Sequence, residues 1–267
     1  MHSVESDRAW WGMRTMVTPQ ELTEYDLSRY NRQMLIAGWG ADGQARLKAA
    51  TVFIAGAGGL GSPVALYLAA AGVGRLRVCD ADTVELSNLN RQILHTDVRI
   101  GMLKAKSAVQ TLREVNPSIR IEPLAVYLKR ENARDVIGRP DIMVDCLDNY
   151  ETRYLLSSYS IEHHIPLVHG AVWGLFGQLT FLYPPETPCL RCLTPEAPPK
   201  SVFPVAGVTP GLVGSLQAME VLKFLTGVGA NLKGKLLTFD GADAAFMTLN
   251  IHRARECPDC GHLSLEG

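Results

Sequence analysis

Residues 51–91, TVFIAGAGGLGSPVALYLAAAGVGRLRVCDADTVELSNLNR, decide the fold of this chain. They begin with an apolar, β-branched run at residues 51–55, which is typical of a buried parallel strand. The turn GAGGLG follows at once. We predict a helix that begins near Ser62 and Pro63, because serine is a good N-cap and proline suits the first helical turn. A second strand at residues 75–78 completes a β-α-β unit.

The glycines of this turn predict an anion-binding site. Gly56, Gly58 and Gly61 have the G-x-G-x-x-G spacing, which allows a tight turn, close approach to phosphate and close helix packing. The following helix would point its orphan amides and positive dipole at the turn. Asp80 follows the second strand, where an acidic residue can reach a ribose hydroxyl. We therefore predict that these glycines, with Gly59, bind a nucleotide. NAD, FAD, ATP and S-adenosylmethionine all remain open, as does a purely structural turn.

The composition is that of a globular α/β protein. The chain has 267 residues, of which 47% are hydrophobic, so it can bury a substantial core. Its net charge of −1 gives no reason to expect bulk attraction to nucleic acid or membranes. No apolar run approaches the roughly 20 residues that span a bilayer, and the start lacks the pattern of a signal peptide. We expect a soluble cytoplasmic protein without nucleic-acid or membrane partners.

Four further polar residues are candidates for the same site. Asn88 and Arg91 lie three positions apart, on one face of an expected short helix. Lys104 falls in a first helical turn, where its charge opposes the macrodipole unless a phosphate compensates it; a solvated lysine is the alternative. Asp148 ends the strand expected at 141–147, and ligands of open α/β sheets bind outside such strand ends. Its carboxylate suits Mg²⁺, although it could instead cap the next helix.

The second half of the chain changes its periodicity. Strands alternate with helices up to about residue 170, which predicts a parallel sheet. A period-2 pattern then predicts an antiparallel strand at 177–183, and two further strands, at 235–240 and 244–251, are expected to close the sheet. The expected fold class is α/β, a Rossmann-like, mostly parallel sheet continued by antiparallel strands. We expect the following organisation: an N-terminal extension at 1–24, and one domain at 25–267 whose halves cover about 50–170 and 171–267.

Two C-x-x-C pairs indicate a metal site. They are Cys189 with Cys192 and Cys257 with Cys260. Four thiolates suit tetrahedral Zn²⁺ in a structural site, which would clip the end of the domain onto its body. A redox dithiol is the alternative for either pair, but both pairs lie in proline-punctuated loops instead of at the start of a thioredoxin-like helix.

The motifs GAGGLGS, DADTVELSNLNRQ, Lys104, DCLDN and the paired C-x-x-C, in this order, resemble the ThiF/MoeB/HesA adenylyltransferases, relatives of the ubiquitin-activating enzymes. The resemblance covers about residues 26–261 and includes RYNRQ and SLQAMEVLKFLTG. It implies an enzyme that uses ATP to adenylate the C-terminal glycine of a small ubiquitin-like sulfur carrier ending in Gly-Gly, with release of pyrophosphate. An external sulfur donor, such as a cysteine desulfurase, a rhodanese or sulfide, would then form the thiocarboxylate.

The resemblance also implies a role for each site residue. Asp80 would bind the ribose, and Asn88, Arg91 and Lys104 would contact the triphosphate. Asp148 would coordinate Mg²⁺. Arg32, in RYNRQ, would reach the phosphates of the neighbouring subunit, which makes a homodimer part of the active site. The half at 171–267 would bind the carrier as well as zinc.

One segment departs from the family pattern. Many members carry a loop cysteine after the first knuckle, whereas this chain reads VFPVAGV, with Phe203 or a neighbour in that place. We therefore expect an enzyme that only adenylates. The alternatives are an NAD-dependent oxidoreductase, a non-catalytic module that binds a ubiquitin-like protein, and adenylation of a peptide or small-molecule carboxylate. The sequence names neither the carrier nor its pathway.

Overall fold

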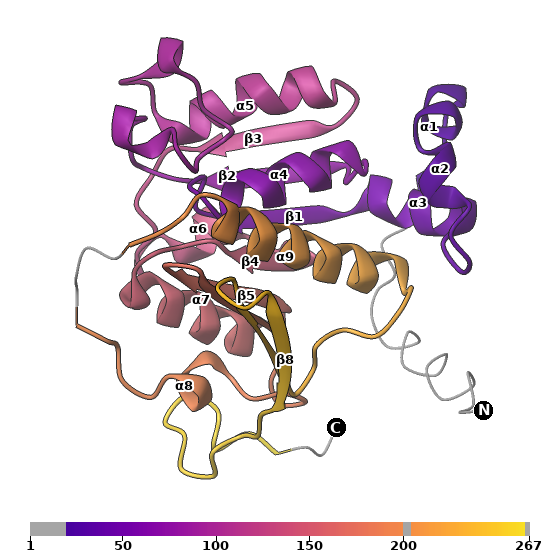
Figure 1. Ribbon diagram of the computed structural model, residues 1–267. Coiled ribbons are helices and arrows are strands. Elements are labelled where there is room, and N and C mark those ends of the chain that lie inside the picture. Colours follow the sequence, from indigo (N-terminus) through magenta and orange to yellow (C-terminus); the bar gives the residue numbers. More distant parts are fainter. Residues whose placement is uncertain (1–19, 200–203, 265–267) are drawn as a thin grey trace.

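The computed structural model describes residues 20–199 and 204–264, which are built around one eight-stranded sheet in the order β3-β2-β1-β4-β5-β6-β7-β8 (Figure 1). The strands β3 to β5 pair in parallel, and β5 to β8 pair antiparallel. This confirms the predicted fold class. The strands are β1 Thr51–Ala55, β2 Arg75–Cys79, β3 Arg120–Leu124, β4 Ile142–Asp145, β5 Leu167–Trp173, β6 Phe176–Leu182, β7 Lys235–Asp240 and β8 Ala245–Asn250.

Helices cover both faces of the parallel strands. They are α1 Glu24–Arg29, α2 Asn31–Met34, α3 Gly40–Ala49, α4 Gly61–Ala70, α5 Lys104–Val115, α6 Ala133–Ile137, α7 Tyr150–His163, α8 Leu190–Leu193 and α9 Val208–Thr226. Side chains of β1 alternate between the two faces. Val52 and Ile54 join the core that includes residues of α4, α5 and α9. Phe53 and Ala55 join the core on the other face, with residues of α6 and α7.

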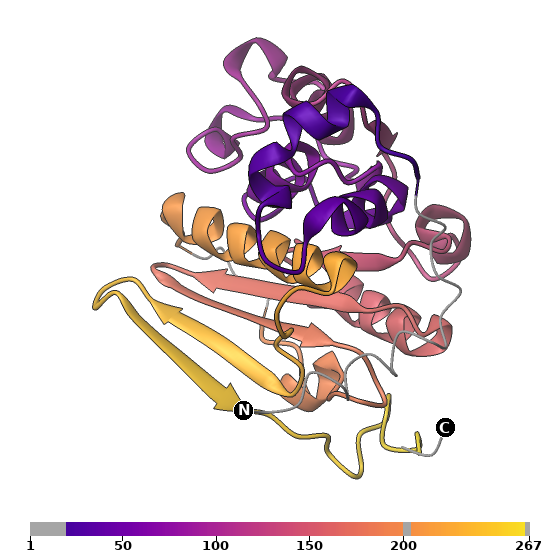
Figure 2. The same cartoon turned by 90° about the vertical axis from the view of Figure 1, so that its right-hand side faces the viewer.

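The antiparallel strands extend the sheet beyond most of this helical cover. Helix α9 (orange) lies along β5 and β6, whereas β7 and β8 continue past it to the sheet edge (Figure 2). All six residues of β8 are exposed. The apolar core is therefore concentrated in the parallel half, and the edge of the antiparallel half faces solvent.

The arm α1–α3 packs at one end of α4. Thr23 caps α1 in a capping box with Asp26, whose buried carboxylate also pairs with Lys48 at 2.7 Å. Gln33 Nε2 donates to the carbonyl oxygen of Ala71, directly after the last turn of α4, at 2.8 Å. The arm therefore lies at the end of α4 that is opposite to the GAGGLG turn (Figure 1).

Within residues 20–199 and 204–264, no helix combines the length and the apolar character needed to cross a bilayer.

Candidate nucleotide and metal sites

The glycine turn requires missing side chains at two positions. Gly56 has a φ of 99°, and a Cβ there would lie 2.6 Å from the carbonyl oxygen of Cys146 in the neighbouring chain segment. A Cβ on Gly61 would collide with the carbonyl oxygen of Gly56. The turn is therefore as tight as the glycine spacing predicted.

The first turn of α4 differs in one detail from the prediction. Ser62 is not the N-cap, because the helix begins at Gly61 and Ser62 lies inside it. Its hydroxyl donates to the carbonyl oxygen of Gly58 at 2.8 Å and accepts from the backbone N–H of Leu94 at 3.3 Å. Among the described residues, no acceptor is found for the N–H groups of residues 58–61. These amides remain available to an anion.

Asp80 lies against this turn. Its Oδ2 accepts from the backbone N–H of Ala57 at 2.8 Å, and its Oδ1 accepts from that of Asp82 at 2.9 Å. Burial raises the pKa of the Asp80 carboxyl. The carboxylate is thus held beside the glycines, where a ribose could reach it.

Lys104 is the first residue of α5 and is buried, with 7% of its surface exposed, so it is not a solvated lysine. Its Nζ lies 3.2 Å from Oδ2 of Asp82, a carboxylate whose side chain is 56% exposed. The Asp82 partner of this ion pair is largely solvated, and an ammonium group at a helix N-terminus is suited to a phosphate.

Asn88 and Arg91 lie in the segment after β2. A short 3₁₀ helix at Leu86–Asn88 ends before Arg91, so the two residues do not share one helix as expected. Asn88 is buried, and its Oδ1 accepts from the N–H of Glu85 at 3.2 Å. Arg91 donates to the carbonyl oxygen of Ser87 at 2.9 Å. The Cγ of Arg91 would lie 3.5 Å from a Cβ on Gly59, which places its stem beside the turn.

Asp148 is exposed just beyond β4, the strand next to β1. Asn149, and not Asp148, caps α7, because its Oδ1 accepts from the N–H of Thr152 at 2.9 Å. The preceding residue is fixed: Leu147 donates its N–H to Asp145, and its carbonyl oxygen accepts from Arg153. The Asp148 carboxylate is therefore not used as a helix cap.

Arg32 lies apart from these residues. It is exposed on α2, in the arm at the far end of α4. Helix α4 has 10 residues and so is about 15 Å long. The structure brings Asp80, Arg91, Lys104 and Asp148 to the carboxyl end of the parallel strands, but it does not bring Arg32 to the turn of its own chain.

Sequence reasoning left two buried histidines without a role. Nδ1 of His169 lies 2.7 Å from Oδ2 of Asp145, and the two residues are direct partners in the β4–β5 ladder. A polar residue in each of two otherwise apolar strands was the sequence feature that could have indicated this buried pair. His95, in the segment after Arg91, forms a hydrogen bond with the glycine turn itself. No motif or periodicity around His95 in the sequence indicated this contact.

The four knuckle cysteines converge. Their sulfur atoms all lie within 4.8 Å of one another. The pair Cys189–Cys192 is 3.8 Å apart, Cys189–Cys257 3.5 Å and Cys192–Cys260 3.4 Å. Thiolates around a tetrahedral zinc ion, each with a Zn–S bond of about 2.3 Å, would be about 3.8 Å apart. The cluster is thus consistent with a zinc site.

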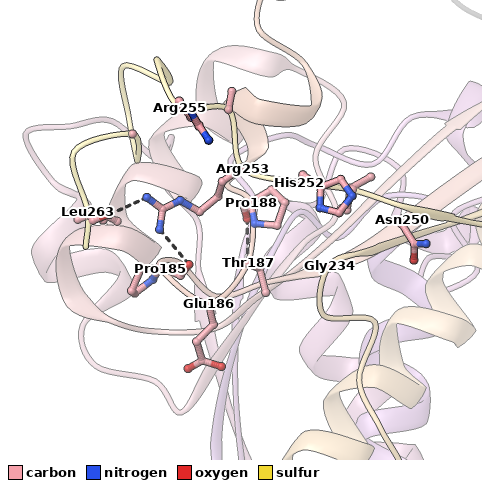
Figure 3. Close-up of a pocket in the computed structure, with 13 residues that line it drawn as sticks. Pro185, Glu186, Thr187, Pro188, Gly234, Asn250, His252, Arg253, Arg255 and Leu263 are labelled. Carbon is pink, nitrogen blue, oxygen red and sulfur yellow. Dashed lines mark hydrogen bonds between the residues drawn. The ribbon is translucent and has the colours of Figure 1, made fainter. Parts of the chain in front are cut away.

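A cavity of about 570 Å³ adjoins this cluster (Figure 3). Arg253 extends along it and donates to the carbonyl oxygens of Pro185 at 3.1 Å and Leu263 at 2.6 Å (Figure 3). It also donates to the carbonyl oxygen of Cys260 at 3.0 Å. The guanidinium therefore fastens the segment of the second cysteine pair to the loop that precedes the first pair. None of the cavity's lining residues comes from the glycine turn.

Comparisons with known proteins agree with this architecture. Residues 30–260 match the model of the ThiF family. The chain is 44% identical over 250 residues to a sulfur carrier protein adenylyltransferase of Thermus thermophilus, which covers 90% of this chain and 92% of that protein. It is 45% identical over 240 residues to the adenylyltransferase and sulfurtransferase MOCS3-1 of Zea mays, with 88% of this chain but only 51% of that protein covered.

A solved structure shares the fold. The structure of E. coli MccB with MccA-N7isoASN superposes with a TM-score of 0.79 at 21% identity, covering 93% of this chain and 77% of that chain. With the family match across most of its length and relatives above 40% identity, the chain belongs to the ThiF family.

Proposed function

We propose that the protein is an ATP-dependent adenylyltransferase that activates the C-terminal glycine of a small ubiquitin-like sulfur carrier. One observation carries the proposal: the amides of residues 58–61, for which the described residues provide no acceptor, share one end of the sheet with the buried Lys104 in a ThiF-family chain. The activity named for the Thermus thermophilus relative supports this function over the oxidoreductase alternative.

In the proposed reaction, the carrier carboxylate attacks the α-phosphorus of ATP, and pyrophosphate leaves. Two anions must meet, so the site needs positive groups where negative charge accumulates. We assign Asn88, Arg91 and Lys104 to the triphosphate and Asp80 to the ribose. The turn of Gly56, Gly58, Gly59 and Gly61 would cradle the phosphates through its amides.

No protein nucleophile is needed for this half-reaction, and the cysteines outside the cluster are poor candidates for one. Cys79 and Cys146 are buried. Burial raises the pKa of the Cys79 thiol to about 12 and that of Cys146 well above its ordinary value. Phe203, in the segment that lacks the family's loop cysteine, lies outside the described residues. We propose that the enzyme hands the acyl adenylate to an external sulfur donor.

Two metal ions fit the residues present. Mg²⁺ is commonly held by one or two carboxylates together with substrate phosphates, and Asp148 offers such a carboxylate. Zn²⁺ suits the four thiolates and would be structural, because the cluster keeps no open position. We also propose a cytoplasmic location, where reducing conditions keep these four thiols free of disulfides.

We propose a homodimer in which Arg32 completes the site of the partner subunit. The distance from Arg32 to its own glycine turn, about the length of α4, supports action on another copy. Two large apolar side chains next to it are exposed, Leu35 at 72% and Ile36 at 47%. Such a patch beside a charged residue is a candidate subunit contact.

We propose that the carrier docks on the half at 171–267, against β8. This strand exposes Phe246, Met247 and Leu249. It is the last strand of the sheet among the described residues, and an apolar sheet edge suits a partner protein that packs against it. The parallel half at 50–170 would then bind the nucleotide. A Gly-Gly tail has no side chains to obstruct its path to the α-phosphorus.

The first experiment is ATP/pyrophosphate exchange with a panel of small carriers that end in Gly-Gly. We expect exchange with a particular carrier and its loss in Asp148→Ala. Glu151→Ala is the matched control, because Glu151 is an exposed carboxylate in the first turn of α7. This variant should support exchange at the wild-type rate. Exchange with no carrier, despite ATP binding, would contradict the proposed substrate.

Mixing two inactive variants tests the dimer. Random pairing of Arg32→Ala with Asp148→Ala subunits should restore about a quarter of the wild-type sites, because each mixed dimer keeps one intact site. No recovery after subunit exchange would place Arg32 in its own chain's site or outside catalysis.

A further inference from the structure

His95 bridges two elements of the proposed nucleotide site. The side chain is 5% exposed. Its Nε2 lies 2.9 Å from the carbonyl oxygen of Ala57, inside the GAGGLG turn. Its Nδ1 lies 2.9 Å from the hydroxyl of Ser107. Ser107 is on α5, one turn after Lys104, so a single ring spans from the glycine turn to the helix that carries the buried lysine.

The chemistry of the partners assigns the proton on this ring. A carbonyl oxygen can only accept, so Nε2 must carry the hydrogen that it donates to Ala57. Burial lowers the pKa of His95, which favours the neutral ring. Nδ1 of the neutral ring then accepts from the Ser107 hydroxyl. Ser107 is itself held, because Arg99 donates to its carbonyl oxygen at 2.9 Å.

This bond controls the direction of an amide in the turn. The C=O of Ala57 and the N–H of Gly58 belong to one trans peptide group, and in such a group they point in opposite directions. A carbonyl fixed toward His95 therefore turns the Gly58 N–H away from His95. That N–H is one of the amides for which the described residues provide no acceptor.

The preceding peptide is fixed from another side. The N–H of Ala57 donates to Asp80. Two consecutive peptide groups of the turn are thus each held by a side chain from a different segment. A Cβ at Gly58 would meet only the amide of Gln92, at 3.5 Å, so packing alone leaves the Gly58 peptide some room.

We propose that His95, as the neutral Nε2–H form, is a positioning residue for nucleotide phosphate: it aims the Gly58 amide and sets the glycine turn in register with Lys104. This inference rests on the proposed nucleotide site and goes beyond it, because His95 itself touches no substrate. It predicts that ATP binding depends on a hydrogen-bond donor at the Nε2 position and not merely on a polar residue at 95.

Two conservative variants separate these possibilities. The amide nitrogen of glutamine can occupy the place of Nε2, whereas the shorter asparagine reaches only the place of Nδ1. We would measure the Kd of a non-hydrolysable ATP analogue by calorimetry, without carrier. His95→Gln should bind within about threefold of wild type, and His95→Asn about tenfold more weakly, as the loss of one hydrogen bond implies. His163→Asn, on the partly exposed end of α7, is the control and should bind as wild type does.

Steady-state kinetics distinguish a positioning role from general damage to the fold, because damage to the fold would lower kcat as well. In pyrophosphate exchange, His95→Asn should raise the KM for ATP and keep most of the kcat at saturating ATP. If His95→Asn does not fold, Ser107→Ala, which frees Nδ1, should still weaken analogue binding by about threefold. Wild-type affinity in folded His95→Asn, or equal weakening in the Gln and Asn variants, would overturn the inference. A wild-type protein that binds no ATP would instead overturn the proposed function, and the inference with it.

Discussion

The two ends of the sheet are stabilised in different ways. In the parallel half, β4 is buried along its whole length, as is β1 apart from its first residue. In the antiparallel half, all six residues of β8 are exposed. The glycine turn is fixed by side chains of the same chain, namely Asp80 and His95. The far half relies on four thiols that suit a metal and leaves apolar surface uncovered.

This difference indicates a division of labour. A site that must hold phosphate oxygens in a defined geometry benefits from preorganised amides and buried charge. A surface that must bind and release a protein partner can instead remain exposed to solvent. The side chains of the parallel half therefore hold its site in place, whereas we propose that a metal and a carrier complete the other half.

Removing the buried charge of the parallel half should have the largest effect on activity. We expect Lys104→Ala to lower kcat/KM for pyrophosphate exchange by about 10²–10³-fold, because one preorganised donor to the developing charge is lost. Lys106→Ala is the matched control, since Lys106 is exposed in the same helical turn. If both variants lose activity equally, the location of Lys104 at the turn has no special role.

Removing the metal should damage the antiparallel half selectively. Wild-type protein should contain about one zinc per chain, measured by atomic absorption. Cys192→Ser should lose the zinc and become sensitive to limited proteolysis near its C-terminal segment, while the Kd for ATP stays within about twofold. Cys79→Ala, in β2, should retain zinc. Loss of ATP binding together with zinc would show that the two halves are less independent than we infer.

A charge on the exposed edge should affect only the carrier. We expect Met247→Glu, whose side chain is 59% exposed on β8, to raise the KM for the carrier about tenfold without changing that for ATP. Tyr67→Glu, at an equally exposed apolar position on α4, serves as the control. An unchanged carrier KM in Met247→Glu would move the carrier surface away from β8.

Acidification should produce the smallest effect, and in the parallel half. Burial lowers the pKa of His95, with Lys104 and Arg99 acting in the same direction, so the unfolded chain binds the proton more readily than the folded one. The stability from this group is present above the unfolded pKa of about 6.5 and is lost as pH falls. The fall in Tm between pH 7 and pH 5.5 should be smaller in His95→Gln. An identical fall would mean that other groups dominate.

Sequence patterns predicted most of the β1-turn-α4-β2 unit because its signals are local: an apolar run, glycines at fixed spacing and an acid after the next strand. The convergence of the four cysteines also followed from ligand chemistry. Helix α9 begins at Val208, so Pro210 lies within its first turn, where a proline is tolerated although the residue otherwise breaks helices.

Other features depend on contacts that no local pattern contains. The bond from His95 to Ala57 joins residues 38 positions apart and needs both segments in place. Ser62 looked like a cap because its type and position fit one, yet its hydroxyl links Gly58 to Leu94 inside the first turn. The separation of Arg32 from the turn depends on how the arm packs against the end of α4, which follows from tertiary structure alone.

The cysteine cluster has a consequence for how this architecture can be extended. Cys189 and Cys257 are 68 residues apart, so a metal at the cluster makes the intervening chain a closed loop anchored at one point. The entropic cost of closing a loop grows only logarithmically with the length of the loop, so doubling that length adds about 0.6 kcal/mol. A whole additional module could therefore be inserted within that loop, at an exposed connection such as the β7–β8 turn, at little thermodynamic cost, and the enlarged loop would still be closed at the same four thiols.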